Sequence, residues 1–261
     1  MSSRETADEI GPFAWHGFAM SGPAPKAIFF DMDDTILADS VHTAACLQSV
    51  CEKHALAARA SVADLRAAME HASDWYWGDR DRHRLGRLDL DRARVEVAVL
   101  ALRELGIENQ GLAAAMASEH AAMKDAMLCP FPGALATLRE LRDRGVATAL
   151  LTNGHSRKQR AKIDRFGLAE FFQAIVIESE FGVGKPDPRV YQHALAQLKV
   201  APAETWMVGD NLEWDVEAPM RLGITGIWLD PEARGLPVDC AIHPDRIVHA
   251  LPELFDEGGI A

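Results

Sequence analysis

Four short apolar runs in this chain are each followed by polar residues of types that take part in catalysis. The runs cover 27–30, 146–151, 174–177 and 205–208. The polar residues that follow them are, in order, Asp31, Asp33 and Thr35; Thr152, Asn153 and Gly154; Lys185; and Asp210, Asn211 and Asp215. Each group alone fits an ordinary turn or helix cap. Four groups in this order favour a functional site, because turn formation does not require charged residues to follow every run.

The carboxylates set the chemistry of such a site. If Asp31 and Asp210 lie side by side they repel each other, so a cation must hold them together. These two carboxylates, with a backbone carbonyl near Asp33, offer the oxygen ligands that suit Mg²⁺. Because no cluster of histidines or cysteines accompanies them, the ligand set argues against zinc.

The apolar runs themselves predict the sheet that would position these residues. They are four to six residues long and rich in Val, Ile and Phe, and a fifth run covers 224–229. Helical patterns at 134–144, 156–166 and 188–198 separate them. This alternation predicts an α/β fold, a Rossmann-like doubly wound parallel sheet. Ligands of such folds bind beyond the carboxyl ends of the strands, where the polar groups would meet.

The segment between the first two runs has a different pattern. It contains no convincing strand, and helices are expected at 41–57, 62–77, 90–105 and 112–127. We therefore predict an α/β core domain of 26–38 and 130–261 and an inserted all-helical cap domain of 39–129. The hinges would be 37–40 and 129–133. Residues 1–25 are expected to be an extension without fixed structure.

The composition of the chain limits the kinds of partner that it can bind and the cellular compartments that fit it. The formal net charge of −12 argues against nucleic acid, because a polyanion would be repelled. No apolar run approaches the ~20 residues that cross a bilayer, and the N-terminus does not have the pattern of a secretory signal. The four cysteines form no CxxC pair, which favours reduced thiols in the cytoplasm. The oligomeric state stays open.

The four polar groups also resemble the signatures of a known family. The strings Asp31-x-Asp33-x-Thr35, Thr152-Asn153, Gly184-Lys185-Pro186 and Gly209-Asp210-x₄-Asp215 are similar to the four motifs of the haloacid dehalogenase (HAD) superfamily. The match spans about 26–229, and the helical segment stands where that superfamily carries a cap. Three strings, Thr-Asn-Gly, Gly-Lys-Pro and Gly-Asp-Asn-Leu-Glu-x-Asp, resemble the branch of N-acetylneuraminate 9-phosphatase and pyrimidine 5′-nucleotidases.

The resemblance implies a role for each residue. Asp31 would be the nucleophile and form an aspartyl-phosphate, and Asp33 would be the general acid and then the general base. Lys185 would neutralise charge on Asp31 and on the phosphoryl group. Thr152 and Asn153 would bind the phosphoryl oxygens. Mg²⁺ would be held by Asp31, Asp210 and the carbonyl of Asp33, with Thr35, Gly154, Asn211 and Asp215 in support.

Three functions are compatible with this set. The first is a phosphomonoesterase that acts on a small phosphorylated metabolite, such as a sugar phosphate, a sugar-acid phosphate or a nucleotide. The acidic residue at Asp33 favours phosphoryl chemistry, since the dehalogenases of the superfamily lack it. The second is a phosphomutase or another phosphoryl transferase. The third is a catalytically silent binding protein of the same fold.

One stretch of the helical segment is a candidate for substrate contacts. It contains Trp75, Tyr76 and Trp77, followed by arginines and a histidine between Arg80 and Arg87. Aromatic rings with local positive charge bind sugars, bases and anions. The favoured interpretation is nevertheless structural. The aromatic side chains would pack between helices, and the arginines would form salt bridges to neighbouring aspartates.

Overall fold

The computed structural model describes residues 25–255 of the chain. The predicted N-terminal extension, 1–25, lies outside them except for Pro25. Among the described residues no helix is both long and apolar enough to span a membrane. The cytoplasmic location stays a prediction.

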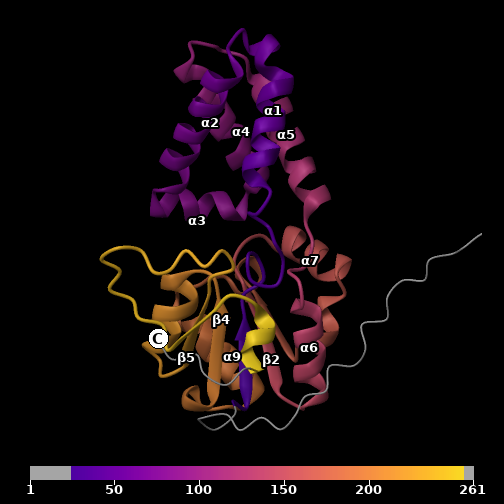
Figure 1. Ribbon diagram of the computed structural model, residues 1–261, viewed down its shortest axis with the longest axis vertical. Coiled ribbons are helices and arrows are strands. Elements are labelled where there is room, and N and C mark those ends of the chain that lie inside the picture. The colour runs from indigo at the N-terminus through magenta and orange to yellow at the C-terminus, as the bar shows by residue number, and fades with distance from the viewer. Residues whose placement is uncertain (1–24, 256–261) are drawn as a thin grey trace, which may run out of the picture.

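A six-stranded sheet, parallel throughout, forms the base of the molecule (Figure 1). The strands are β1 (Ala27–Phe30), β2 (Ala147–Thr152), β3 (Ala174–Ile177), β4 (Thr205–Gly209), β5 (Thr225–Leu229) and β6 (Arg246–Val248). Their order across the sheet is β3-β2-β1-β4-β5-β6, so the chain builds outward in both directions from β1. The predicted fold class is confirmed. The short strand β6 was not expected.

β1 is buried on both faces, as an inner strand of a parallel sheet must be. Ile28 and Phe30 belong to one apolar cluster, and Ala27 and Phe29 belong to another on the opposite face. All four side chains are at most 1% exposed. The alternation of side chains along the strand therefore joins the two core layers through β1.

Helices cover both faces of this sheet. Those of the sheet-forming part are α6 (Ala134–Asp143), α7 (Ser156–Arg165), α8 (Glu178–Phe181), α9 (Pro188–Leu198) and α10 (Ala218–Met220). Short helical turns are η1 (Leu168–Phe171), η2 (Pro202–Glu204), η3 (Leu212–Glu217) and η4 (Leu251–Phe255). Residues of α6 and α7 pack on the Ile28 face of β1, and residues of α9 pack on the Phe29 face.

Five helices lie between β1 and β2 and form a separate group above the sheet (Figure 1). They are α1 (Thr43–Ala58), α2 (Val62–Trp77), α3 (Arg80–Leu88), α4 (Leu90–Glu104) and α5 (Gln110–Met127). Helices α1, α2, α4 and α5 share an apolar cluster of their own. α3 was not predicted, although Asp79 caps it by accepting hydrogen bonds from the backbone N–H groups of Asp81 and Arg82.

The sheet order brings three of the polar groups to one edge. β1 pairs with β2 on one side and with β4 on the other. Asp31, Asn153 and Asp210 are the residues directly beyond the ends of these three neighbouring strands. The direction of chain progression reverses at this point, where open α/β sheets form their ligand crevice.

Candidate active site

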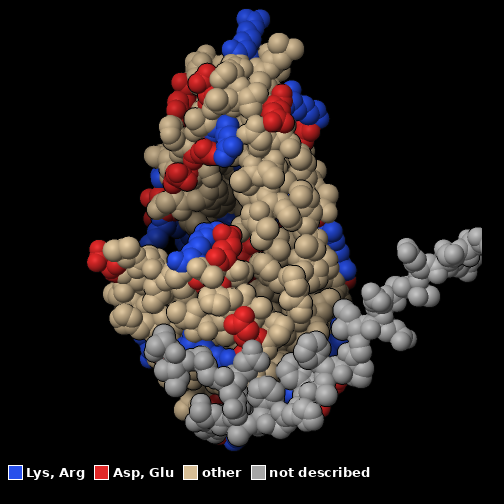
Figure 2. Space-filling model, in the orientation of Figure 1, with Lys and Arg blue, Asp and Glu red and all other residues tan. Residues whose placement is uncertain are grey.

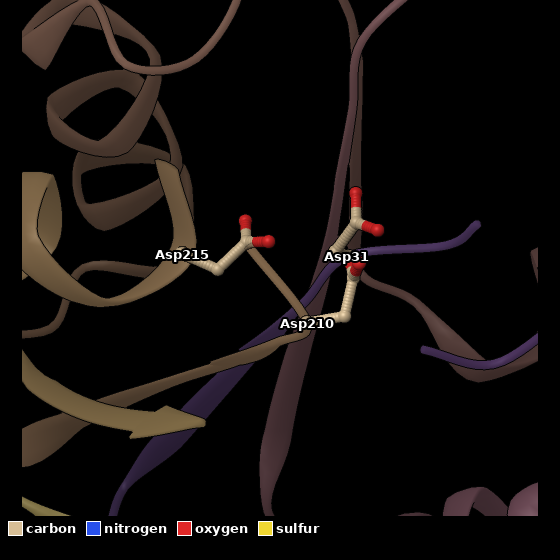
Figure 3. A group of neighbouring side chains, drawn as sticks. All are labelled: Asp31, Asp210 and Asp215. Atoms are coloured by element: carbon tan, nitrogen blue, oxygen red, sulfur yellow. The ribbon is translucent and has the colours of Figure 1, made fainter. Parts of the chain in front are cut away.

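Three carboxylates and one lysine meet at the end of β1. Oxygens of Asp31, Asp210 and Asp215 lie within 4.8 Å of one another, and Figure 3 shows Asp215 pointing towards the other two side chains. Lys185 Nζ donates hydrogen bonds to Asp31 Oδ1 and Asp215 Oδ1, each 2.6 Å long. Lys185 is 1% exposed. A buried ammonium is thus matched by two buried carboxylates, as the cost of desolvation requires.

The cluster carries more negative charge than Lys185 offsets. Burial raises the pKa of Asp31 to about 7; Lys185 lowers it, while Asp215 and Asp33 raise it. Burial, followed by the charges of Asp31 and Asp215, raises the pKa of Asp210 to about 9. Burial alone would lower the pKa of Lys185, but the two aspartates hold it above the ordinary value. Full ionisation of the aspartates at neutral pH therefore needs a further positive charge.

The donor set fits a hard divalent cation. Asp31 and Asp210 offer oxygen ligands beside the backbone of Asp33, and no histidine or cysteine belongs to the acidic cluster found in the described part of the chain. Asp210 is held in place because its backbone carbonyl accepts a 2.7 Å hydrogen bond from Trp228 Nε1. Asp215 is engaged by Lys185 and by the backbone N–H of Asn211, which suits a supporting residue.

Asp33 lies at the edge of this cluster and is held by two side chains of α7. Gln159 Nε2 donates to Asp33 Oδ2 at 2.9 Å, and Lys162 Nζ donates to Asp33 Oδ1 at 2.7 Å. The same Lys162 ammonium reaches Asp39 at 2.9 Å. Asp33 therefore has a fixed orientation two residues from Asp31, within the same cavity.

The residues after β2 are also held at the site. Thr152 is 3% exposed, and its hydroxyl accepts a 2.7 Å hydrogen bond from Gln159. The side chain of Asn153 pairs at both ends with the backbone of Lys185, at 2.8 Å each. It therefore anchors the lysine loop, and a contact of Asn153 with a phosphoryl group would use its backbone N–H. The N–H of Gly154 donates to Glu178.

Two further supporting residues have different surroundings. Asn211 caps the turn η3 by accepting hydrogen bonds from the N–H groups of Glu213 and Trp214. Thr35 is fully buried, and its hydroxyl has no hydrogen-bond partner within the described residues. Of the predicted site residues, Thr35 alone is not among the residues that line the cavity.

A cavity of about 610 Å³ lies over the carboxylates, between the sheet and the helical group. Figure 2 shows the hollow between the two parts, with Lys and Arg side chains near its edge. Its wall on the helical side includes Trp77, His83, Arg87, Leu90 and Arg94. The volume is within the range of sites for small molecules.

Salt bridges join the two walls. Arg87 of α3 forms a bidentate pair with Glu178, with two bonds of 2.7 Å, and both side chains are largely buried. Arg80 pairs with Glu213. The ring of His83 lies between Trp77 and Trp214, in edge contact with each.

The three aromatic residues of this stretch lie in three different surroundings. Trp75 is 55% exposed and Arg82 stacks on its ring, so this pair lies outside the cavity wall. Tyr76 is buried in the apolar cluster of the helices. Trp77, His83 and Arg87 line the cavity.

Sequence reasoning missed several residues that hold the site together. They are Gln159, Lys162, Glu178, Trp214 and Trp228. The sequence contained a signal for Gln159 and Lys162. They lie three positions apart, hence on one face of a helix that begins just after Thr152-Asn153-Gly154, so both could have been expected near the site. Glu178 follows β3 directly, and the other polar groups of the site were recognised because they too follow apolar runs.

Sequence comparison identifies relatives of this chain. A profile described as haloacid dehalogenase-like hydrolase matches residues 25–223. A phosphoserine phosphatase of Thermus thermophilus is 46% identical over 126 residues, which are 48% of this chain and 49% of that protein. The chain thus spans about half the length of that relative. A glyceraldehyde 3-phosphate phosphatase of Methanopyrus kandleri is 31% identical over 77% of this chain and 82% of its own length. A pyrimidine 5′-nucleotidase of Escherichia coli is 29% identical over 87% and 95%.

The predicted resemblance is confirmed by these relatives, which include both a pyrimidine 5′-nucleotidase and N-acylneuraminate-9-phosphatases. Because the relatives are phosphatases, the expectation of a phosphatase of this family is confirmed as well.

Solved structures agree on the fold. A HAD hydrolase of Bacillus subtilis bound to magnesium matches with a TM-score of 0.68 at 21% identity, over 89% of this chain and 98% of that one. An L-2-haloacid dehalogenase of Xanthobacter autotrophicus matches with a TM-score of 0.59 at 23% identity, over 88% and 96%. Because the family profile matches residues 25–223, which is most of the chain, the chain belongs to the haloacid dehalogenase-like hydrolase family.

Proposed function

We propose that this chain is a Mg²⁺-dependent phosphomonoesterase that hydrolyses a small phosphorylated metabolite through an aspartyl-phosphate on Asp31. The observation that carries the proposal is the convergence of Asp31, Lys185 and Asp210 at the floor of a cavity between the sheet and the helical group, with Asp33 beside them. The phosphatase names of the relatives support the reaction class. The Bacillus subtilis structure with bound magnesium supports the cation.

In the proposed reaction the residues of the chain act in two steps. An Asp31 carboxylate oxygen attacks phosphorus, and the bond from phosphorus to the ester oxygen breaks. Asp33 gives a proton to the departing alcohol. Asp33 then accepts a proton from water, whose oxygen attacks phosphorus, releases inorganic phosphate and restores the Asp31 carboxylate.

The remaining groups hold charge in place during both steps. Lys185 neutralises Asp31 and the phosphoryl oxygens, and the residues after β2 offer a hydroxyl and N–H groups. Mg²⁺, when bound by Asp31, Asp210 and the Asp33 carbonyl, supplies the positive charge that the carboxylates need and offsets charge on the phosphoryl group. The helical group would act as a cap that excludes bulk water. Its boundaries, 39–129, and the hinges on either side are part of the proposal.

The experiment is hydrolysis of p-nitrophenyl phosphate by wild-type protein and by Asp31→Asn, in Mg²⁺ and in EDTA. We expect release of inorganic phosphate without any added acceptor, dependence on Mg²⁺, and a loss of about 1,000-fold or more in Asp31→Asn. Asp245→Asn is the control, because Asp245 is an exposed aspartate that accepts a hydrogen bond from the backbone N–H of Gly226 and does not line the cavity. Release of p-nitrophenol that requires an alcohol acceptor, with the phosphoryl group recovered on that alcohol and not as inorganic phosphate, would favour a transferase instead.

A further inference from the structure

The cavity is lined by six cationic side chains of lysine and arginine, and five of them have a hydrogen-bonded carboxylate. They are Lys185 with Asp31 and Asp215, Lys162 with Asp33 and Asp39, Lys124 with Asp39, Arg87 with Glu178, and Lys158 with Asp91. These five cations are matched within the protein. Arg94 is the sixth.

Arg94 has no hydrogen-bonded partner among the described residues. The one carboxylate within 4.0 Å of its guanidinium is Asp91, at 3.8 Å, too far for a hydrogen bond. Asp91 is already engaged by Lys158 at 3.0 Å and by Arg157 at 3.4 Å, and it is half exposed. The Arg94 side chain is only 22% exposed. A largely buried guanidinium thus keeps its donors unused.

The surroundings of Arg94 combine the ammonium of Lys124, the imidazole of His120, which is uncharged at neutral pH, and apolar surface. His120 and Lys124 of α5 lie near enough that the charges of Lys124 and Arg94 help to lower the pKa of His120, after its burial. His120 also contacts the carbonyl of Thr43. Leu90, one turn before Arg94 on α4, adds an apolar surface for a carbon skeleton. The wall therefore offers a guanidinium without a hydrogen-bonded carboxylate among the described residues, beside apolar surface.

We propose that Arg94 binds a carboxylate of the substrate, so that the enzyme acts on phosphate monoesters of carboxylic acids. The inference rests on the proposed function, because it assumes that the phosphate group occupies the floor of the cavity at Asp31. A guanidinium pairs with a carboxylate in a planar, bidentate geometry. One guanidinium with free hydrogen-bond donors fits a monoanion better than a second phosphate group.

The experiment compares substrates that differ only in this group. 3-Phosphoglycerate is paired with glycerol 3-phosphate, and 6-phosphogluconate is paired with glucitol 6-phosphate, so that two chain lengths are tested. In each pair a carboxylate replaces a hydroxymethyl group. Wild-type protein should prefer the acid of at least one pair in kcat/KM. Arg94→Gln should reduce that preference by about 10- to 100-fold, the range expected for a charged hydrogen-bonded contact.

Arg92→Gln is the matched control. Arg92 is the same residue type on the same helix, is exposed, and lies two positions away and hence on a different face. Its substitution should leave the preference unchanged. Titration calorimetry of the same pairs with Asp31→Asn and with Asp31→Asn/Arg94→Gln gives a readout independent of turnover, and the second variant should lose the preference for the acid.

Three results would overturn the inference. The first is that wild-type protein shows no preference for the acid in either pair, and the second is that the preference survives Arg94→Gln. The third is that Arg94→Gln lowers kcat/KM for fructose 1,6-bisphosphate relative to fructose 6-phosphate but does not change kcat/KM for either acid. In each case turnover of p-nitrophenyl phosphate by wild-type protein would leave the proposed function standing. Failure of wild-type protein to release phosphate from any ester would instead contradict the proposed function.

Discussion

The salt bridge between Arg87 and Glu178 offers a direct test of how the helical group is held over the sheet. Arg87 Nε and Nη2 donate to the two oxygens of Glu178, at 2.7 Å each. Arg87 is 14% exposed and Glu178 is 5% exposed. Glu178 also accepts a hydrogen bond from the backbone of Gly154, next to the residues expected to face the phosphoryl group. Arg87→Ala removes the cationic partner and leaves the carboxylate behind.

The magnitude follows from burial and geometry. Removing one partner of a buried ion pair costs about 3–5 kcal/mol when the other charge stays buried. The lower end applies here, because water can reach Glu178 if the helical group moves away from the sheet. A cost of about 3 kcal/mol shifts the equilibrium between closed and open arrangements by about 100-fold. If the closed arrangement is the reactive one, we expect kcat/KM to fall by up to about 100-fold.

The assay is steady-state hydrolysis of p-nitrophenyl phosphate, with unfolding in urea measured in parallel to separate closure from folding. Arg84→Ala, an exposed arginine of the same helix, is the control. Glu178→Ala should reproduce the loss although Glu178 does not line the cavity, and the double variant should add little more. Equal kcat/KM values for Arg87→Ala and Arg84→Ala would refute the reasoning.

Three further predictions concern the floor of the site. Lys162→Ala frees Asp33, so hydrolysis of alkyl phosphates, which need a protonated leaving group, should fall about tenfold more than hydrolysis of p-nitrophenyl phosphate; equal losses would contradict this role. Gly209→Ala would place a Cβ 2.3 Å from Asp215 Cγ, and should lower the free energy of unfolding by about 1–3 kcal/mol in urea titrations; an unchanged midpoint would argue against the packing. The raised folded-state pKa of Asp210, about 9, favours its protonated form, so its contribution to stability is present at low pH and is lost as the pH rises towards 9. Between pH 5 and 9 the Tm should therefore fall further in EDTA than in Mg²⁺, and identical profiles would count against a cation at this carboxylate.

The sheet and its polar ends could be predicted because their signals are local. β1 is a buried apolar run that stops at Asp31, and the chain repeats this pattern at Thr152 and Asp210. Parallel strands align their carboxyl ends, so three local patterns are enough to predict one convergent site. The structure places these residues around one cavity.

Other features depend on contacts that no local pattern describes. α3 is short and rich in arginine, and its one buried residue is Gly86, so it lacks the repeated buried apolar positions that reveal a longer helix. The role of Asn153 was expected to be phosphoryl binding, but its side chain is used by the backbone of Lys185, which lies 32 residues away in sequence. The pairing of Arg87 with Glu178 spans 91 residues. Such long-range partners become visible only in the folded chain.

The central claim is that Asp31 accepts the phosphoryl group, and trapping that group tests it most directly. In Asp33→Asn, p-nitrophenyl phosphate still provides a good leaving group, but the base for the hydrolytic water is removed. We expect acid quenching followed by peptide mass spectrometry to find the phosphoryl group on the peptide that contains Asp31, with none in Asp31→Asn/Asp33→Asn. A phosphoryl group on another residue, or continued turnover by Asp31→Asn, would contradict the account.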